Sequence, residues 1–459
     1  MRRSLGTGSG VVVAVAAAVL VLGGAARTGA AVPEALTVLS VDRASLLRAS
    51  PSGVLPASLG PARAASTWCG TPTTQDQAPN AVAGNAIHWL YVVPSDGGDR
   101  LSTEASAMQT DAELIDSWWR GQDPTRAPRN DLTPLTCGMQ LDLSDVRLTA
   151  SGSQLDDDVR FDRIVAGIEA AGFRSPFVKY IVYFDGPVSD TNLCGQGGSD
   201  PSGFGVAVVY VRSCSGIAPS LVAAHELLHT LGAVPDAAPH NCPPPNDGHV
   251  CDSSSDIMYP FASPVPLSSM ILDVGRDDYY GHSGSWLDVQ DSAWLVQLDR
   301  QTPFALTVAG PGSVASDVPG LLCSSSCTTT WNTGTHLNLT ATPASGAKLV
   351  RWGGACSGSG ACGVSVAAGA SASALFAPLT YRLSVSVGGK GRVVSSRAGI
   401  SCPTRCSAAF PSYSALRITT RPAKGWRFRA WTGACRGTAG VCTLPMSRNT
   451  SARAVFAKA

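Results

Sequence analysis

The pattern of apolar and polar positions changes near residue 300. Before that point, continuous apolar runs typical of buried strands occupy 87–93, 178–184 and 205–213. Between them, apolar residues at helical spacing predict helices at 103–121 and 161–172, each with charged residues on the other face. Strands that alternate with helices predict a sheet that carries packed helices.

After residue 300 the pattern is that of short strands with glycine turns, and it repeats. Cys323 and Cys402, Trp352 and Trp431, and Cys356 and Cys435 are each 79 residues apart. A constant separation at three kinds of marker indicates two copies of one module. We therefore expect an α+β domain at 66–300 followed by two small β-rich modules at 304–378 and 379–459.

The N-terminal residues have the pattern of an export signal. Arg2 and Arg3 precede an apolar run of about fifteen residues and then small residues suited to cleavage near Ala30 or Ala31. We expect a signal peptide at 1–31, and a propeptide or linker at 32–65. No other segment approaches the ~18 apolar residues of a membrane span, so the mature protein is expected to be extracellular.

The cysteine pattern agrees with export. There are fourteen cysteines, an even number, and none has the spacing of a zinc ribbon or a redox pair, so we expect a disulfide framework. In the two modules we expect local bridges, with crossed pairing as the alternative. The expected pairs are 323–327, 356–362, 402–406 and 435–442.

The net charge of +1 hides two oppositely charged halves. Residues 1–300 hold 18 Lys and Arg against 32 Asp and Glu, whereas 301–459 hold 16 against one. The second module alone, 379–459, has fourteen basic residues and no acidic one. A field of one sign attracts polyanions, so an anionic cell-wall polymer or an acidic substrate is an expected partner. Nucleic acid is not expected, because the chain has an export signal and lacks a nucleic-acid-binding motif.

The segment HELLHTLG carries the strongest chemical signal. Pro219 marks the start of a helix and Gly232 its end. Within that helix His225 and His229 lie one turn apart on one face, so both imidazoles can bind one zinc ion, while Glu226 can act on a water molecule. Glu226 is the last glutamate in the chain, so a third ligand farther along must be His or Asp.

This segment, together with Met258 in SSSDIMYP about 30 residues later, resembles the metzincin clan of zinc endopeptidases. Within the clan it is similar to secreted bacterial enzymes with the pattern HELLHxLGAV…APH, and the resemblance covers about residues 66–300. It implies a mixed sheet, an active-site helix, and a methionine turn beneath the zinc ligands. It also implies that Glu226 is the general base and that the strand at 205–213 is an edge strand that pairs with an extended peptide substrate.

The third ligand departs from the clan's pattern, because Pro235 occupies the usual position three residues after Gly232. The candidates are Asp236, His240 and His249. We favour His240, because imidazole is the better neutral zinc ligand and because the resemblance to the APH-bearing enzymes indicates it. Asp236 and His249, which lies between two cysteines, remain alternatives.

The two C-terminal modules resemble divergent internalin-type bacterial repeats. The expected function is a secreted endopeptidase with one catalytic zinc ion, acting on a protein or peptide substrate, whose basic repeats aid attachment. The alternative is an adhesin with a weakly active or inactive metalloprotease-like domain. Asp273, Asp277 and Asp278 have the residue type that binds calcium, but a solvated acidic loop is the favoured interpretation of them. His88, in an apolar run, is expected to be a core residue.

Overall fold

The computed structural model describes residues 45–49, 66–78, 80–412 and 414–459 of the 459. The predicted signal peptide lies outside these residues, and so does most of the segment at 32–65. Among the described residues, no helix combines the length and the apolar composition needed to cross a bilayer.

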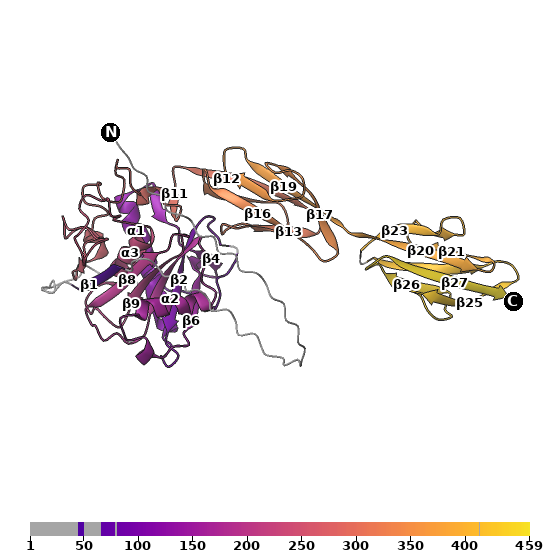
Figure 1. Ribbon diagram of the computed structural model, residues 1–459, viewed down its shortest axis with the longest axis horizontal. Coiled ribbons are helices and arrows are strands. Elements are labelled where there is room, and N and C mark those ends of the chain that lie inside the picture. The colour runs from indigo at the N-terminus through magenta and orange to yellow at the C-terminus, as the bar shows by residue number, and fades with distance from the viewer. Residues whose placement is uncertain (1–44, 50–65, 79, 413) are drawn as a thin grey trace, which may run out of the picture. The chain divides into compact units, whose positions relative to one another are not determined.

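The N-terminal domain is built on a mixed seven-stranded sheet (Figure 1). Three of its strands, β2, β7 and β9, contain the apolar runs predicted from sequence, and β6, β2, β7 and β9 run parallel to one another. β8 is antiparallel to β9 and to β1, and β1 is parallel to β10. In spatial order the strands are β10 (Phe261–Ala262), β1 (Ser45–Ala49), β8 (Leu193–Ser199), β9 (Gly205–Tyr210), β7 (Val178–Phe184), β2 (Ala86–Val93) and β6 (Leu143–Arg147).

Three α-helices of the described residues cover both faces of this sheet. They are α1 (Leu101–Gln122), α2 (Arg160–Ala170) and α3 (Pro219–Thr230). Side chains alternate along each strand: in β2, Trp89 and Tyr91 pack in the core with α1 and α3, whereas Leu90 and Val92 pack with α2. The prediction of a sheet with packed helices is therefore confirmed, and the sheet is mixed.

Smaller elements complete this domain. β3 (Arg126–Pro128) pairs with β11 (Leu295–Gln297), and β4 (Leu132–Leu135) pairs with β5 (Gly138–Leu141). Short 3-10 helices occupy Gly152–Gln154, Leu267–Ser269 and Val289–Asp291. Disulfides join Cys69 to Cys137, Cys194 to Cys214 and Cys242 to Cys251.

Each C-terminal module consists of two four-stranded sheets, and the strand order is the same in both modules. The predicted local bridges, 323–327, 356–362, 402–406 and 435–442, are confirmed. The first module contains β12 (Gln301–Ala309), β13 (Gly312–Ser316), β14 (Leu322–Cys323), β15 (Cys327–Asn332), β16 (His336–Pro343), β17 (Ala347–Gly354), β18 (Cys362–Ser365) and β19 (Ser371–Pro378). The second contains β20 (Thr380–Gly388), β21 (Gly391–Ser395), β22 (Ser401–Cys402), β23 (Ser407–Pro411), β24 (Ala415–Pro422), β25 (Trp426–Gly433), β26 (Val441–Pro445) and β27 (Thr450–Lys458).

Candidate metal centre

Helix α3 places three chemically active side chains in the interior of the N-terminal domain. Pro219 occupies the first turn, where its missing N–H costs nothing. Gly232 has φ +86° just after the helix, a conformation that glycine adopts without strain. The helix is buried along its whole length except at Pro219, so His225, Glu226 and His229 are held in fixed positions.

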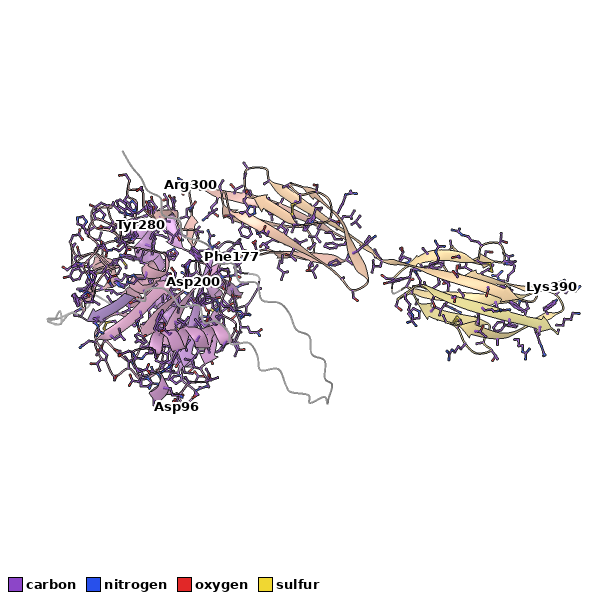
Figure 2. The ribbon with its side chains drawn as sticks, viewed as in Figure 1. Asp96, Phe177, Asp200, Tyr280, Arg300 and Lys390 are labelled. Carbon is purple, nitrogen blue, oxygen red and sulfur yellow. A yellow bond between two sulfur atoms is a disulfide. The ribbon has the colours of Figure 1, made fainter. Side chains whose placement is uncertain are left out.

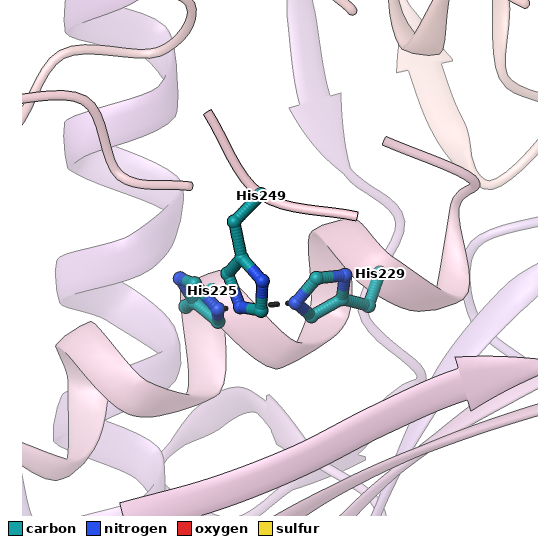
Figure 3. Close-up of side chains that lie close together, drawn as sticks. All are labelled: His225, His229 and His249. Carbon is teal, nitrogen blue, oxygen red and sulfur yellow. Dashed lines mark hydrogen bonds between the residues drawn. The ribbon is translucent and has the colours of Figure 1, made fainter. Parts of the chain in front are cut away.

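A third imidazole joins the two on the helix, and it belongs to His249 (Figure 3). All three histidines are buried, and one ligand atom from each lies within 4.8 Å of the others. Ring centroids are 4.8 Å apart for His225 and His229, 5.1 Å for His225 and His249, and 4.8 Å for His229 and His249. Three neutral imidazoles arranged in this way form a donor set that suits zinc.

Hydrogen bonds indicate which ring nitrogen is available on two of these histidines. Nδ1 of His225 donates to the backbone oxygen of Ile257 at 2.6 Å, and Nδ1 of His249 donates to that of Asn246 at 3.1 Å. Each Nε2 therefore carries a lone pair. Nε2 of His225 lies 3.1 Å from Nε2 of His229, and Nε2 of His249 is buried without a hydrogen-bond partner. Ligating histidines typically use the second nitrogen for such an orienting bond.

Burial also keeps these rings neutral. It lowers the pKa of His225 to about 3 and that of His249 to about 4. The pKa of His229 is held well below its usual value by burial and by the neighbouring His249 and His225. Because only a neutral imidazole binds a metal ion, the environment favours the ligating form.

The loop that carries His249 is closed by the Cys242–Cys251 disulfide. Its ends are also joined by backbone hydrogen bonds, from Cys242 N–H to His249 O at 2.7 Å and from Cys251 N–H to His240 O at 3.0 Å. Gly248, with φ +84°, turns the chain immediately before the ligand. The proposed disulfide-closed loop around His249 is thus present.

His240, the third ligand favoured from the sequence, lies apart from this group. Its Nδ1 bonds to Oδ2 of Asp278 at 3.0 Å and its backbone N–H donates to Oδ1 of the same carboxylate at 2.8 Å. The structure brings together His225, His229 and His249, the alternative that the sequence analysis kept open. Asp236, the other alternative, lines the adjacent cavity but is not part of the three-histidine group.

Glu226 is fully buried, and neither of its carboxylate oxygens has a hydrogen-bond partner among the described residues. Burial raises the pKa of this carboxyl well above its ordinary value. The side chain lies against β8, where a Cβ added at Gly195 would come 2.6 Å from Oε1. Glycine at this position leaves the space that the carboxylate occupies, and the absence of an ion pair leaves the group available for proton transfer.

Met258 lies in a buried turn next to the centre, as the sequence predicts. Its backbone N–H donates to Oδ1 of Asp256 at 2.7 Å, and its backbone oxygen accepts from Val250 N–H at 3.1 Å. Asp256 is itself held by the hydroxyl of Tyr279 at 2.8 Å. This network couples the turn to the loop that carries His249.

A cavity of about 680 Å³ opens beside the histidines. His229 and His249 lie in its wall together with Gly198 and Ser199 of β8, Phe261 of β10 and Arg48 of β1. The strand at 205–213, expected at the edge of the sheet, is β9, which lies between β8 and β7. That expectation is wrong: β8 is the strand beyond β9, and β1 covers its outer side.

The remaining candidates do not join the metal centre. Asp273 accepts hydrogen bonds from the backbone N–H groups of Asp278, Tyr279 and Tyr280, and Asp278 binds His240. These acidic residues therefore have protein partners that account for their positions. Sequence reasoning missed the burial of His88 among carboxylates, because its apolar flanks are also typical of a plain core histidine.

Comparison with known proteins identifies the C-terminal modules. Residues 316–378 and 381–459 each match the Divergent InlB B-repeat domain, which confirms the predicted internalin-type resemblance. No curated protein matches the chain.

Solved structures give distant likenesses only. The Bacillus anthracis TIE protein is 8% identical over 35% of this chain and 34% of its own, with a TM-score of 0.24. Metalloproteinase-II from Bacteroides fragilis is 15% identical over 45% of this chain and 55% of its own, with a TM-score of 0.25. OgpA from Akkermansia muciniphila is 9% identical over 83% of this chain and 99% of its own, with a TM-score of 0.25. The chain spans about a third and about half of the first two structures, and at these TM-scores the likenesses identify no function.

Proposed function

We propose that the N-terminal domain is a zinc-dependent endopeptidase of metzincin type, with His225, His229 and His249 as zinc ligands. The observation that carries the proposal is the convergence of three buried, neutral imidazoles beside a buried carboxylate that has no partner. The unpartnered Nε2 of His249 fits a metal ligand, because a buried polar atom without a partner costs free energy unless something binds it.

When bound, zinc supplies a positive charge that polarises a peptide carbonyl and makes a water molecule more acidic. Glu226 then takes a proton from the attacking water as the new C–O bond forms. The same carboxyl gives that proton to the departing amide nitrogen as the C–N bond breaks. Its buried, unpaired state suits both steps, because the carboxyl is not committed to another cation.

An extended peptide has a place to bind between β8 and β10. β1 already occupies this position, antiparallel to β8 and parallel to β10, and an ion pair joins its Arg48 to Asp190. Main-chain hydrogen bonds to a sheet edge are a general way of binding extended peptides. We propose that the segment at 32–65 is a propeptide whose β1 strand covers the substrate position.

A second candidate function is attachment through the second repeat. All fourteen of its Lys and Arg side chains are exposed, and it contains no acidic residue. Lys390, between β20 and β21, projects from one end of this module (Figure 2). This one-signed surface favours an anionic polymer as the partner of the repeat.

The test of the proposed function is casein hydrolysis by the chain that begins at residue 32 and by the chain that begins at residue 66. We expect chelator to abolish cleavage, added zinc to restore it, and Glu226→Gln to lower kcat/KM by roughly 10²–10⁴-fold with zinc content unchanged. The glutamine keeps the shape of the side chain and removes only its ability to accept the proton. If both wild-type forms are as inert as the variant at full zinc occupancy, the endopeptidase proposal fails and attachment becomes the main function.

A further inference from the structure

A second group of metal-binding side chains lies elsewhere in the N-terminal domain. It consists of Asp76, His88, Asp131 and Asp142, each with one ligand atom within 4.8 Å of the others. His88 lies in β2, Asp131 immediately precedes β4, and Asp142 connects β5 to β6. Asp76 belongs to a loop that reaches this point from the N-terminal side.

Three of the four residues are in the interior. His88 is 0% exposed, Asp131 1% and Asp142 1%, whereas Asp76 is exposed and lies on the solvent side of the group. A buried site with one ligand at the surface has an entry path for an ion from solution. Oδ1 of Asp131 is buried and has no hydrogen-bond partner in the part of the chain that the structure describes.

The charges of the group do not balance within the protein. The ion pairs of the described residues give it no Lys or Arg, and include only His88, whose Nδ1 lies 2.9 Å from Oδ2 of Asp131 and which is neutral in the form that can bind an ion. Burying carboxylates without a counter-charge is costly. A divalent cation would balance two of the three negative charges.

The surrounding hydrogen bonds hold the side chains of His88 and Asp142 as ligands are usually held. Gln77 donates from its backbone N–H and its side-chain amide to the two oxygens of Asp142, each at 2.7 Å. Nε2 of His88 bonds to the hydroxyl of Ser144 at 3.0 Å, which leaves Nδ1 on the side of Asp131. Two ligands with bonds of about 2.0–2.1 Å to one ion lie about 3 Å apart, and the spacing from Nδ1 to Asp131 agrees with this.

We propose that Asp76, His88, Asp131 and Asp142 bind a second divalent transition-metal ion such as zinc or manganese. The donor atoms of the four side chains indicate this class of metal ion, because imidazole together with carboxylate suits zinc and manganese, whereas calcium prefers oxygen ligands alone. The ion would join the loop that carries Asp76 to β2 and to the β5–β6 connection, and so would act as a structural element. The assignment is independent of the proposed endopeptidase activity.

The experiment counts metal ions per chain by elemental analysis after equilibration with Zn²⁺ or Mn²⁺ and desalting. The double variant His229→Ala/His249→Ala empties the first centre in the full chain. We expect two ions in the wild type with Zn²⁺, one in the double variant, and none when Asp131→Asn is added to it. Asp76→Asn at the exposed mouth should fold normally and lose most of the remaining ion.

Asp162→Asn, which neutralises an exposed carboxylate on α2, is the matched control and should keep the ion. Bound ion should also raise the melting temperature of the double variant but not that of the same variant with Asp76→Asn. A folded double variant that holds no Zn²⁺ or Mn²⁺ overturns the proposal, as does binding of Ca²⁺ alone. Retention of the ion by the Asp76→Asn form at wild-type affinity overturns the assignment of these ligands.

Discussion

His225 and His249 each commit Nδ1 to a backbone oxygen, so the fold itself selects the tautomer of these rings before any ion arrives. Because both rings are buried, a small number of short contacts, these hydrogen bonds among them, fixes the orientation of each ring. The nearby His240 instead binds Asp278 through both its backbone and its ring. His240 and His249, nine residues apart, therefore have different partners. Single substitutions can distinguish their contributions to zinc binding.

We expect His249→Gln to remove one zinc ion per chain and His240→Gln to remove none. Loss of a direct ligand should weaken zinc binding by more than about 100-fold, since changes to outer-shell partners alone cost 10–100-fold. Competition with a fluorescent zinc chelator measures both affinities. The reverse result, with zinc lost in the His240 variant, would restore the ligand favoured from sequence.

The pH profile should separate the proton acceptor from the ligands. With pKa values of about 3 for His225 and about 4 for His249, both rings stay neutral in the folded protein down to about pH 5. Glu226 has its pKa raised by burial and must be ionised to accept a proton, so kcat/KM should be present above that pKa and fall as the pH decreases through it. We expect activity to decline as the pH is lowered toward pH 5 while zinc content stays constant. A parallel decline of zinc content and activity would contradict this explanation.

At the scale of elements, the strand β8 connects the candidate metal centre to the proposed peptide-binding position. Its sequence, LCGQGGS, is rich in glycine, and a Cβ at Gly197 would lie 2.6 Å from the backbone oxygen of Glu226. The strand can therefore approach α3 closely while its other edge pairs with β1. Because β1 pairs with this edge of β8, we expect the segment at 32–65 to control the access of a peptide substrate to it.

A peptide with the sequence of Ser45–Ala49, SLLRA, should inhibit the chain that begins at residue 66 competitively against a peptide substrate. Removal of the segment at 32–65 should raise kcat/KM about tenfold or more, which corresponds to at least ~1.4 kcal/mol of β1 docking. Steady-state kinetics with a quenched fluorescent peptide gives both values. A scrambled peptide is the control, and equal inhibition by both peptides would argue against binding at the β8 edge.

Local patterns predicted the helix α3 and the strands β2, β7 and β9, because apolar periodicity and the HELLH spacing are properties of a single segment. They failed for β8, because glycine is unfavourable in strands and the sequence LCGQGGS has no apolar–polar alternation. The wrong edge strand, 205–213, is an expectation from the family resemblance, and β8 and β1 lie beyond it in the sheet. The choice between His240 and His249 depends on how the Cys242–Cys251 loop folds back onto α3. The separation of these residues along the chain does not predict which of them reaches the helix.

At the scale of the whole molecule, charge divides the chain between an acidic N-terminal part and a basic C-terminal module. Neither repeat contributes a residue to the three-histidine centre. The basic surface and the metal centre can therefore be tested separately. Screening over about 8 Å at physiological ionic strength makes attachment by exposed charges sensitive to salt.

We expect removal of residues 379–459 to reduce retention on purified bacterial cell wall. Retention of the full chain should fall as NaCl rises from about 0.05 to about 0.5 M, because Debye screening strengthens strongly over this range. The double variant Arg427→Glu/Arg429→Glu changes exposed residues of β25 and should weaken retention without loss of the fold. Retention that does not respond to truncation, to charge reversal or to salt would refute electrostatic attachment.

Because Cys242 and Cys251 form a disulfide, the position of His249 depends on whether the surrounding compartment is oxidising or reducing. In a reducing compartment the loop opens, and the third imidazole loses the tether that presents it to α3, so the newly made chain carries an incomplete centre. If the proposed endopeptidase function holds, oxidation outside the cell would complete the centre and so protect the producing cell from its own hydrolase. Zinc content measured before and after mild reduction, with Cys242→Ser/Cys251→Ser as the permanently open form, should show this safeguard directly.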